Sequence, residues 1–304
     1  MSSDTTTSTT PTAASSGTWQ LGDLTVNRVG FGAMRLPQSG PALRSDAASS
    51  DRARSIAVLR RAIELGVNHI DTAAFYFSPL RSANELINSA LAPYPDDLVI
   101  TTKVGPGRDA SGEWTAAATP SQLRGQVEEN LRQLGRDHLD VVNLRIQAPG
   151  PISDRFGALA DLREAGLIRH LGLSNANADH LAEAQAIAPV VCIQNRYGLG
   201  PRREDADDFL RACGDQGIAF VPFFAIAGDG REAGSVEAEN AEVLAVANAH
   251  GATPAQIRLA WTLHRGPHVL AIPGTGNPDH VAENVAAGAL RLSADEVTRL
   301  EALR

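Results

Sequence analysis

The sequence has few of the features expected of an extracellular protein or a nucleic-acid-binding protein. Only two of its 304 residues are cysteines, too few for the disulfide framework of a secreted domain. We therefore expect Cys192 and Cys213 to be reduced and buried, as in a cytoplasmic protein. Acidic residues outnumber basic ones and give a formal net charge of -8. This charge disfavours nucleic acid and anionic membranes as partners, because both bind basic surfaces.

Long apolar runs are also absent, and none approaches the roughly 20 residues needed to cross a bilayer. Residues 1–17 are almost entirely Ser, Thr and Ala, without the basic and apolar regions of a secretory signal, and this composition predicts a disordered tail. The remaining residues, 18–304, suffice for one barrel domain. We expect a soluble monomer or small homo-oligomer with no metal site.

Short β-branched runs alternate with longer segments of helical period from Arg28 onward, which is typical of strand–helix units and a parallel sheet. The predicted strands are Val29–Met34, Asn68–Ala73, Leu98–Lys103, Leu139–Arg145, His170–Asn175, Val190–Asn195, Ala219–Phe224 and Val269–Pro273. The predicted helices include Arg52–Leu65, Gln122–Leu134, Phe156–Ala165, Ala178–Ala186 and Pro254–His264. Eight units, without a Gly-x-Gly-x-x-Gly turn after the first strand, favour a closed (β/α)₈ barrel over an open dinucleotide-binding sheet. A hairpin of Trp19–Leu21 and Leu24–Val26 precedes the barrel and is predicted to plug its bottom.

Polar residues gather at the carboxyl ends of the predicted strands, where such barrels carry their active sites. Asp71, Tyr76 and Lys103 form a chemically coherent set. A cation beside a phenol lowers its pKa, and Lys103 can be that cation, with Asp71 as its counter-charge. The set predicts a general acid for a carbonyl oxygen. Taken singly, Asp71 and Lys103 are better explained as an ordinary rim ion pair and Tyr76 as a packing residue, so the prediction depends on the combination.

The later strand ends carry groups that suit a nicotinamide cofactor. Ser174, Asn175 and Gln194 can hydrogen-bond to a planar carboxamide, and Phe223 offers a ring for stacking. Alternatively, Asn175 caps the following helix, because Asn is a preferred N-cap residue. After the last strand, residues 273–277 lead into a helix whose N-terminus can receive phosphate.

Taken together, these motifs resemble the aldo-keto reductase superfamily from about Trp19 to the C-terminus. The similar segments are Gly66–Ala73 with Tyr76, Thr101–Lys103, Gly172–Asn175, Ile193–Asn195 and Ile272–Asn284. The resemblance implies a barrel fold and NADPH-dependent reduction of an aldehyde or ketone. It also implies that Asp71, Tyr76 and Lys103 belong to a catalytic tetrad and that Phe223 stacks on the nicotinamide. The cofactor's phosphate and adenine would be held by Gly274, Thr275, Asn277, His280, Glu283 and Asn284.

Two departures from the family pattern stand out. Most members carry a histidine at the end of the fourth strand, where this chain has Arg145, a permanent cation that can donate hydrogen bonds to a carbonyl. This form is most similar to bacterial members that include pyridoxal reductases, which implies pyridoxal as a substrate. In the cofactor segment, Gly274 and His280 stand where many members place Lys and Arg. This departure weakens the preference for NADPH. Thr275, Asn277 and the helix N-terminus can still hold the 2′-phosphate, so NADPH is expected, with NADH as the alternative.

Two mouth loops, residues 105–119 and 227–239, are expected to shape substrate choice, with Trp114 and Phe77 in the substrate pocket. Trp114 is equally compatible with a local packing anchor. Three other functions remain open: a catalytically weak NADPH sensor, a reductase of a natural-product or sugar ketone, and a lyase that uses Lys103 as a Schiff-base nucleophile.

Overall fold

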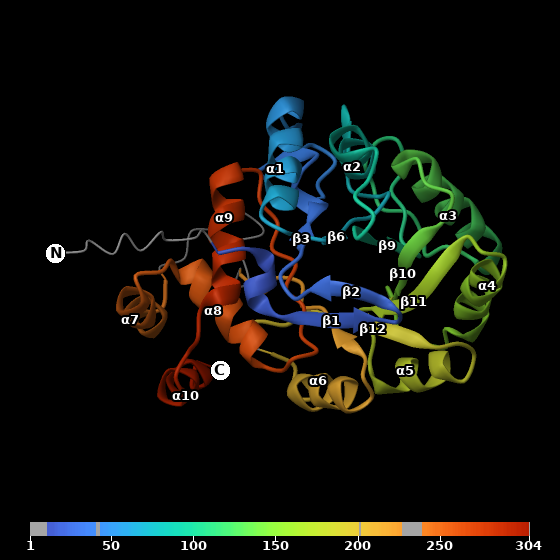
Figure 1. Ribbon diagram of the computed structural model, residues 1–304. Coiled ribbons are helices and arrows are strands. Elements are labelled where there is room, and N and C mark those ends of the chain that lie inside the picture. Colours follow the sequence, from blue (N-terminus) through green and yellow to red (C-terminus); the bar gives the residue numbers. More distant parts are fainter. Residues whose placement is uncertain (1–10, 41–42, 201, 227–238, 304) are drawn as a thin grey trace.

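The computed structural model describes residues 11–40, 43–200, 202–226 and 239–303 (Figure 1). Within these ranges no helix is long and apolar enough to span a membrane, and no group of His, Cys, Asp and Glu is placed to hold a metal ion. Cys192 and Cys213 are buried free thiols, as predicted. Part of the mouth loop predicted at 227–239 lies outside the described residues.

The predicted barrel is confirmed, and its strands form a closed ring. Seven parallel strands pair in the order β13-β12-β11-β10-β9-β6-β3. They are β3 (Phe31–Gly32), β6 (His69–Asp71), β9 (Val99–Val104), β10 (Leu139–Arg145), β11 (Ile168–Ser174), β12 (Val190–Gln194) and β13 (Ala219–Phe220). The predicted eighth strand closes the ring through two bridges, from Val269 to Phe220 and from Ala271 to Val29.

Helices surround this ring (Figure 1). They are α1 (Arg52–Glu64), α2 (Ala83–Leu91), α3 (Pro120–Leu134), α4 (Ser153–Glu164), α5 (Ala178–Gln185), α6 (Ala206–Asp215), α7 (Ala241–His250), α8 (Pro254–His264), α9 (Pro278–Ala286) and α10 (Ala294–Glu301). Helices α3 and α8 begin with capping boxes at Thr119 and Thr253, each followed by a proline, and both features favour the start of a helix. The main core lies between the helices and the outward faces of the strands.

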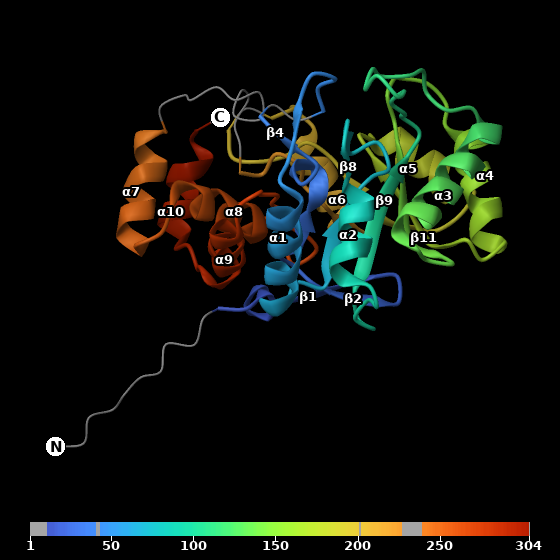
Figure 2. The ribbon, with the colours of Figure 1, turned by 90° about the horizontal axis from the view of Figure 1, so that it is seen from above.

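The predicted hairpin consists of β1 (Thr18–Leu21) and β2 (Leu24–Asn27), and it closes the bottom of the barrel. Its Leu21 and Val26 are fully buried. They belong to an apolar cluster with inward-facing residues of the barrel: Val99, Val141, Cys192, Ala219, Val221 and Leu270. Figure 2 shows the hairpin at one end of the molecule and strand β4 (Gln38–Ser39) at the opposite end. The mouth of the barrel therefore lies at the β4 end.

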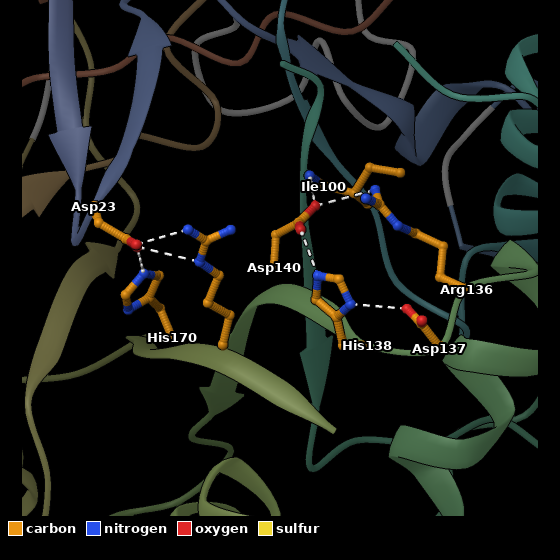
Figure 3. A network of polar contacts seen from close by, with 8 residues as sticks. Asp23, Ile100, Arg136, Asp137, His138, Asp140 and His170 are labelled. Atoms are coloured by element: carbon orange, nitrogen blue, oxygen red, sulfur yellow. Dashed lines mark hydrogen bonds and ion pairs between the residues drawn. The ribbon is translucent and has the colours of Figure 1, made fainter. Parts of the chain in front are cut away.

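Ion pairs fasten the hairpin to the barrel floor (Figure 3). Asp23 in the hairpin turn accepts hydrogen bonds of 2.6 Å each from Arg169 and His170 at the start of β11. These contacts hold the pKa of the Asp23 carboxyl well below its usual range. On the neighbouring strand, Asp140 accepts a hydrogen bond from the Ile100 N–H at 2.8 Å. At the bottom of the barrel, side-chain hydrogen bonds thus connect neighbouring strands to each other and connect β11 to the hairpin turn.

The prediction of a disordered tail is wrong for residues 11–17, whereas residues 1–10 lie outside the described part. Residues Ala13–Ser16 form a short 3₁₀ helix. The Ala13 side chain is fully buried, and its N–H donates to the Leu65 carbonyl at 2.8 Å. Ser16 Oγ accepts a hydrogen bond from the Val29 N–H at 3.1 Å. Small side chains suit this site because they fit against the barrel, a long-range contact that composition does not reveal.

Candidate active site

Asp71 and Lys103 form a buried ion pair inside the mouth of the barrel. They lie on the adjacent strands β6 and β9, which pair in parallel. Lys103 Nζ donates to Asp71 Oδ1 at 2.6 Å and to the Thr72 carbonyl at 3.1 Å. The exposed fractions are 2% for Lys103 and 3% for Asp71, so water screens the pair very little. The structure thus brings together the two charges predicted to meet.

The two strand ends are held from outside by side-chain hydrogen bonds. Thr72, which follows Asp71, donates to Asn84 Oδ1 of α2 at 2.8 Å. Thr102, which precedes Lys103, donates to Asn130 Oδ1 of α3 at 2.6 Å. Residues alternate sides along a strand, so fixing the outward threonines also fixes the direction of the inward Asp71 and Lys103.

The charge on Lys103 is strongly favoured. Burial opposes it, but Asp71 and Tyr76 more than offset that cost, so the pKa of Lys103 is raised above its ordinary value. A Schiff-base nucleophile needs a neutral amine. This environment therefore disfavours the lyase alternative.

Tyr76 lies just beyond β6, with its ring close to the ammonium group. Lys103 Nζ is 4.9 Å from the ring centroid, and the phenol is 5% exposed. The prediction that a cation lowers its pKa is wrong in net direction: burial raises the pKa of Tyr76, although Lys103 and Arg145 oppose that effect. The phenol therefore stays protonated near neutral pH, and the two cations would stabilise a phenolate at this position.

The Gln194 side chain lines the cavity and also hydrogen-bonds to the Asp71–Lys103 ion pair. Its Nε2 donates to Asp71 Oδ2 at 2.7 Å, which was not predicted. Gln194 Oε1 and Ser174 Oγ are both buried and make no hydrogen bond within the described part of the chain. Buried polar atoms are almost always paired. A carboxamide offers a donor and an acceptor, so these two atoms fit a nicotinamide amide group.

Asn175 has a backbone φ of +60°, a left-handed conformation that Asn tolerates better than most residues. Its Nδ2 donates to the Ile146 carbonyl at 2.9 Å. The alternative that Asn175 caps the next helix is wrong, because Asn177 is the N-cap of α5 and accepts from the His180 N–H at 2.9 Å.

Arg145 ends β10 and lines the same cavity. Its guanidinium carbon lies 5.5 Å from the ring centroid of Phe223. Within the described ranges no carboxylate or carbonyl pairs with this guanidinium. A cation without a partner in a cavity attracts an anionic group from a ligand.

The cavity between these residues has a volume of about 280 Å³. It is lined by the predicted residues Asp71, Tyr76, Lys103, Arg145, Gln194, Phe223 and Gly274, and also by Gly32, Met34, Arg35, Leu43, Phe75, Pro222, Phe224, Ala225, Ile226, Ile272 and Pro273. Phe77 and Trp114 are not among the lining residues. Phe75 lines the cavity instead, and the Trp114 ring packs against Phe75 with ring centroids 5.6 Å apart. Sequence analysis missed Phe75 although it precedes Tyr76.

Gly274 leads from the cavity to the N-terminus of α9. Thr275 Oγ1 accepts a hydrogen bond from the Asn277 N–H at 3.0 Å, and Asn277 caps α9 through the Asp279 N–H at 3.3 Å. His280 Nδ1 lies 3.5 Å from Thr275 Oγ1. Farther along α9, Glu283 is exposed and Asn284 is buried. The side chains of Thr275 and Asn277 thus already serve the turn that the sequence assigned to phosphate.

His69, two residues before Asp71, is expected to make folding sensitive to acid. Burial, opposed by Asp71 and aided by Lys103, lowers the pKa of His69 to about 4. The unfolded chain takes up this proton near pH 6.5, so the free energy of unfolding should fall as the pH drops from about 6.5 to about 4. His69→Gln should flatten that fall, by up to about 1.4 kcal/mol per pH unit.

Urea denaturation at several pH values between 7 and 4 measures this effect. His264→Gln, which removes an exposed histidine at the end of α8, is the control. Identical slopes for the two variants would show that the buried ring does not cause the acid sensitivity.

Comparisons with known proteins place this site in a family. The family model described as "Aldo/keto reductase family" matches residues 28–304. Pyridoxine 4-dehydrogenase of Escherichia coli (strain K12) is 42% identical over 296 residues, covering 95% of this chain and 99% of that protein. An uncharacterized oxidoreductase of Schizosaccharomyces pombe is 38% identical over 290 residues, covering 95% and 90%. A solved structure of an aldo-keto reductase from Klebsiella pneumoniae in complex with NADPH is 28% identical, has a TM-score of 0.77, and covers 92% of this chain and 91% of that one.

Proposed function

Because this chain belongs to the aldo/keto reductase family, we propose that it uses NADPH to reduce pyridoxal to pyridoxine, with Tyr76 as the general acid. Family membership makes the chain an oxidoreductase, and the proposal adds the substrate, the cofactor and the proton donor. The observation that carries it is the buried Asp71–Lys103 pair with the Tyr76 ring beside it, in one cavity.

Tyr76, Lys103 and Asp71 supply the proton that the substrate oxygen needs and stabilise the charge left behind. The Tyr76 phenol is protonated at neutral pH because its burial raises its pKa. As negative charge develops on the substrate oxygen, the phenol donates its proton. Lys103, kept cationic by Asp71, stabilises the resulting phenolate. Phe75 and Phe223 make the cavity largely apolar, which strengthens these electrostatic effects by excluding water.

Three features support a nicotinamide cofactor in this cavity. Ser174 Oγ and Gln194 Oε1 are unpaired within the described residues and fit its carboxamide, and Phe223 lines the same cavity as Gln194. Bound NADPH would supply the hydride that the substrate carbon accepts. Thr275, His280 and the first turn of α9 are the groups available for the 2′-phosphate, and the Klebsiella relative was solved with NADPH. NADPH is therefore favoured over NADH.

Arg145 favours a substrate with a negative group close to its carbonyl. Pyridoxal carries an ionisable 3-hydroxyl beside its aldehyde, and a guanidinium can pair with that phenolate. The unpaired state of Arg145 within the described chain and the pyridoxine 4-dehydrogenase relative both support this choice.

The substrate proposal predicts a selective loss on replacing Arg145. Arg145→His should lower kcat/KM for pyridoxal about tenfold more than for benzaldehyde, because one charge-assisted hydrogen bond contributes about 1.5–3 kcal/mol. Steady-state assays with both aldehydes, each with NADPH and with NADH, measure the ratio. Arg145→Lys keeps the charge and should retain part of the preference. Equal losses on both aldehydes in Arg145→His would exclude the phenolate contact.

A further inference from the structure

Arg108 lies in the loop between β9 and α3 and bonds to backbone of three mouth loops. Its Nη1 donates to the carbonyl of Phe77 at 2.8 Å and to that of Phe75 at 3.4 Å. Its Nη2 donates to the Arg44 carbonyl at 3.2 Å, and its Nε to the Gly112 carbonyl at 2.8 Å. One guanidinium therefore joins the loops that follow β3, β6 and β9.

The faces of the same guanidinium contact aromatic rings. The Arg108 guanidinium carbon lies 4.6 Å from the Phe77 ring centroid and 5.9 Å from that of Trp114. The Trp114 ring packs on Phe75 at 5.6 Å, and Phe75 meets the Tyr76 ring edge-to-face at 5.1 Å. Phe75 and Tyr76 both line the cavity. A continuous set of contacts thus runs from Arg108 to the wall of the reaction site.

The segment that carries Arg108 is itself well fixed. Arg108 and Trp114 face each other across an antiparallel bridge. Within it, Asp109 Oδ1 accepts from the Ser111 N–H at 2.9 Å and from the Glu113 N–H at 3.1 Å. These contacts fix the backbone of Trp114 relative to the cavity wall. The Trp114 side chain is 46% exposed, so its ring depends mainly on Phe75 and Arg108 for contacts.

We propose that Arg108 is a positioning residue that holds Trp114 against Phe75, which lines the cavity, and thereby sets the selectivity of the cavity for aromatic carbonyl substrates. Arginine suits the role because a planar guanidinium donates in several fixed directions while its faces stack on rings. A lysine ammonium would keep the positive charge, but it lacks the planar group that donates in several fixed directions and stacks on aromatic rings. The proposal rests on the carbonyl reduction that this family carries out and does not require pyridoxal as the substrate.

The test compares Arg108→Ala and Arg108→Lys with the wild-type chain, using benzaldehyde and propanal. We expect KM for benzaldehyde to rise about tenfold in Arg108→Ala, the cost of losing a well-placed aromatic contact, while kcat changes less than about threefold. KM for propanal, which is too small to need the wall, should stay near the wild-type value. Arg108→Lys should behave like the alanine variant, because the plane is missing in both. Arg124→Ala removes an exposed arginine of α3 and is the matched control.

Limited chymotrypsin digestion gives a readout that is independent of activity. Cleavage after Trp114 should be faster in both Arg108 variants than in wild type and in Arg124→Ala. Unchanged selectivity between the two aldehydes, or unchanged cleavage, would overturn the proposal. If the wild-type chain reduced neither of these aldehydes nor pyridoxal, the proposed function would fail, whereas the digestion would still show whether Arg108 holds the loop.

Discussion

Replacing Tyr76 by phenylalanine is expected to lower kcat about 10²- to 10⁴-fold, the range attributed to a positioned general acid. The ring would still fill its place beside Phe75 and Lys103, so folding and NADPH binding should be nearly unchanged. Stopped-flow measurement of NADPH oxidation gives the rate, and fluorescence titration gives the affinity for NADPH. Such a separation of rate from affinity is the signature of a group that acts only in the reaction.

Tyr94→Phe is the matched control for the loss of a hydroxyl. The Tyr94 hydroxyl donates to the Leu134 carbonyl at 2.6 Å, away from the cavity, so this variant should lose about 1 kcal/mol of stability and no activity. Substantial turnover in Tyr76→Phe would show that another group protonates the substrate.

Replacing Asp71 by asparagine is expected to lower the free energy of unfolding by about 3–5 kcal/mol, the usual cost of leaving one partner of a buried ion pair unpaired. Lys103 would then be a buried cation without the carboxylate that now balances its charge, and the acceptors left beside it, such as the Thr72 carbonyl and the amide oxygen of the new asparagine, are neutral. Gln194 would also lose the carboxylate oxygen that accepts from its Nε2. Urea denaturation followed by circular dichroism measures the loss.

A double-variant cycle distinguishes pairing from general disruption. Lys103→Met alone leaves the Asp71 carboxylate buried and unpaired, so it too should be strongly destabilising. The chain with both Asp71→Asn and Lys103→Met contains neither charge, and it should be less destabilised than the sum of the two single variants. Additive losses would show that the two charges do not stabilise each other.

Sequence patterns predicted the barrel well where a strand or helix has strong local signals. The strand Leu139–Arg145 and the helix Pro254–His264 have the predicted bounds, the first because its residues are nearly all buried and the second because Thr253 begins a capping box. The seventh strand was predicted to reach Phe224, but the regular ladder ends at Phe220. Pro222 has no N–H to donate, and Phe224 has a φ of +65°, so the regular pairing cannot continue.

The meeting of Asp71, Lys103 and Tyr76 was predictable because parallel strands bring their carboxyl ends to one rim. The sequence did not predict that the pKa of Tyr76 is raised. The direction of this shift depends on how deeply the ring is buried, which is a property of the packed barrel. The choice of Phe75 over Phe77 for the cavity wall depends on the turn after β6, in which the Tyr76 N–H donates to the Ala73 carbonyl at 3.0 Å. Neighbouring aromatic residues in a turn have no fixed period from which their directions could be predicted.

The hairpin that seals the floor has a consequence for the order of events in turnover. In the described part of the chain, molecules reach the strand ends only from the end where β4 lies, past the partly exposed Met34 and Leu43. Ser174 and Gln194, by contrast, are fully buried at the ends of β11 and β12. A molecule anchored there must arrive before one that rests against the rim, and it must depart after it. Because the barrel has one opening in the described structure, we expect compulsory-order kinetics, in which the molecule bound at Ser174 and Gln194 binds first and leaves last.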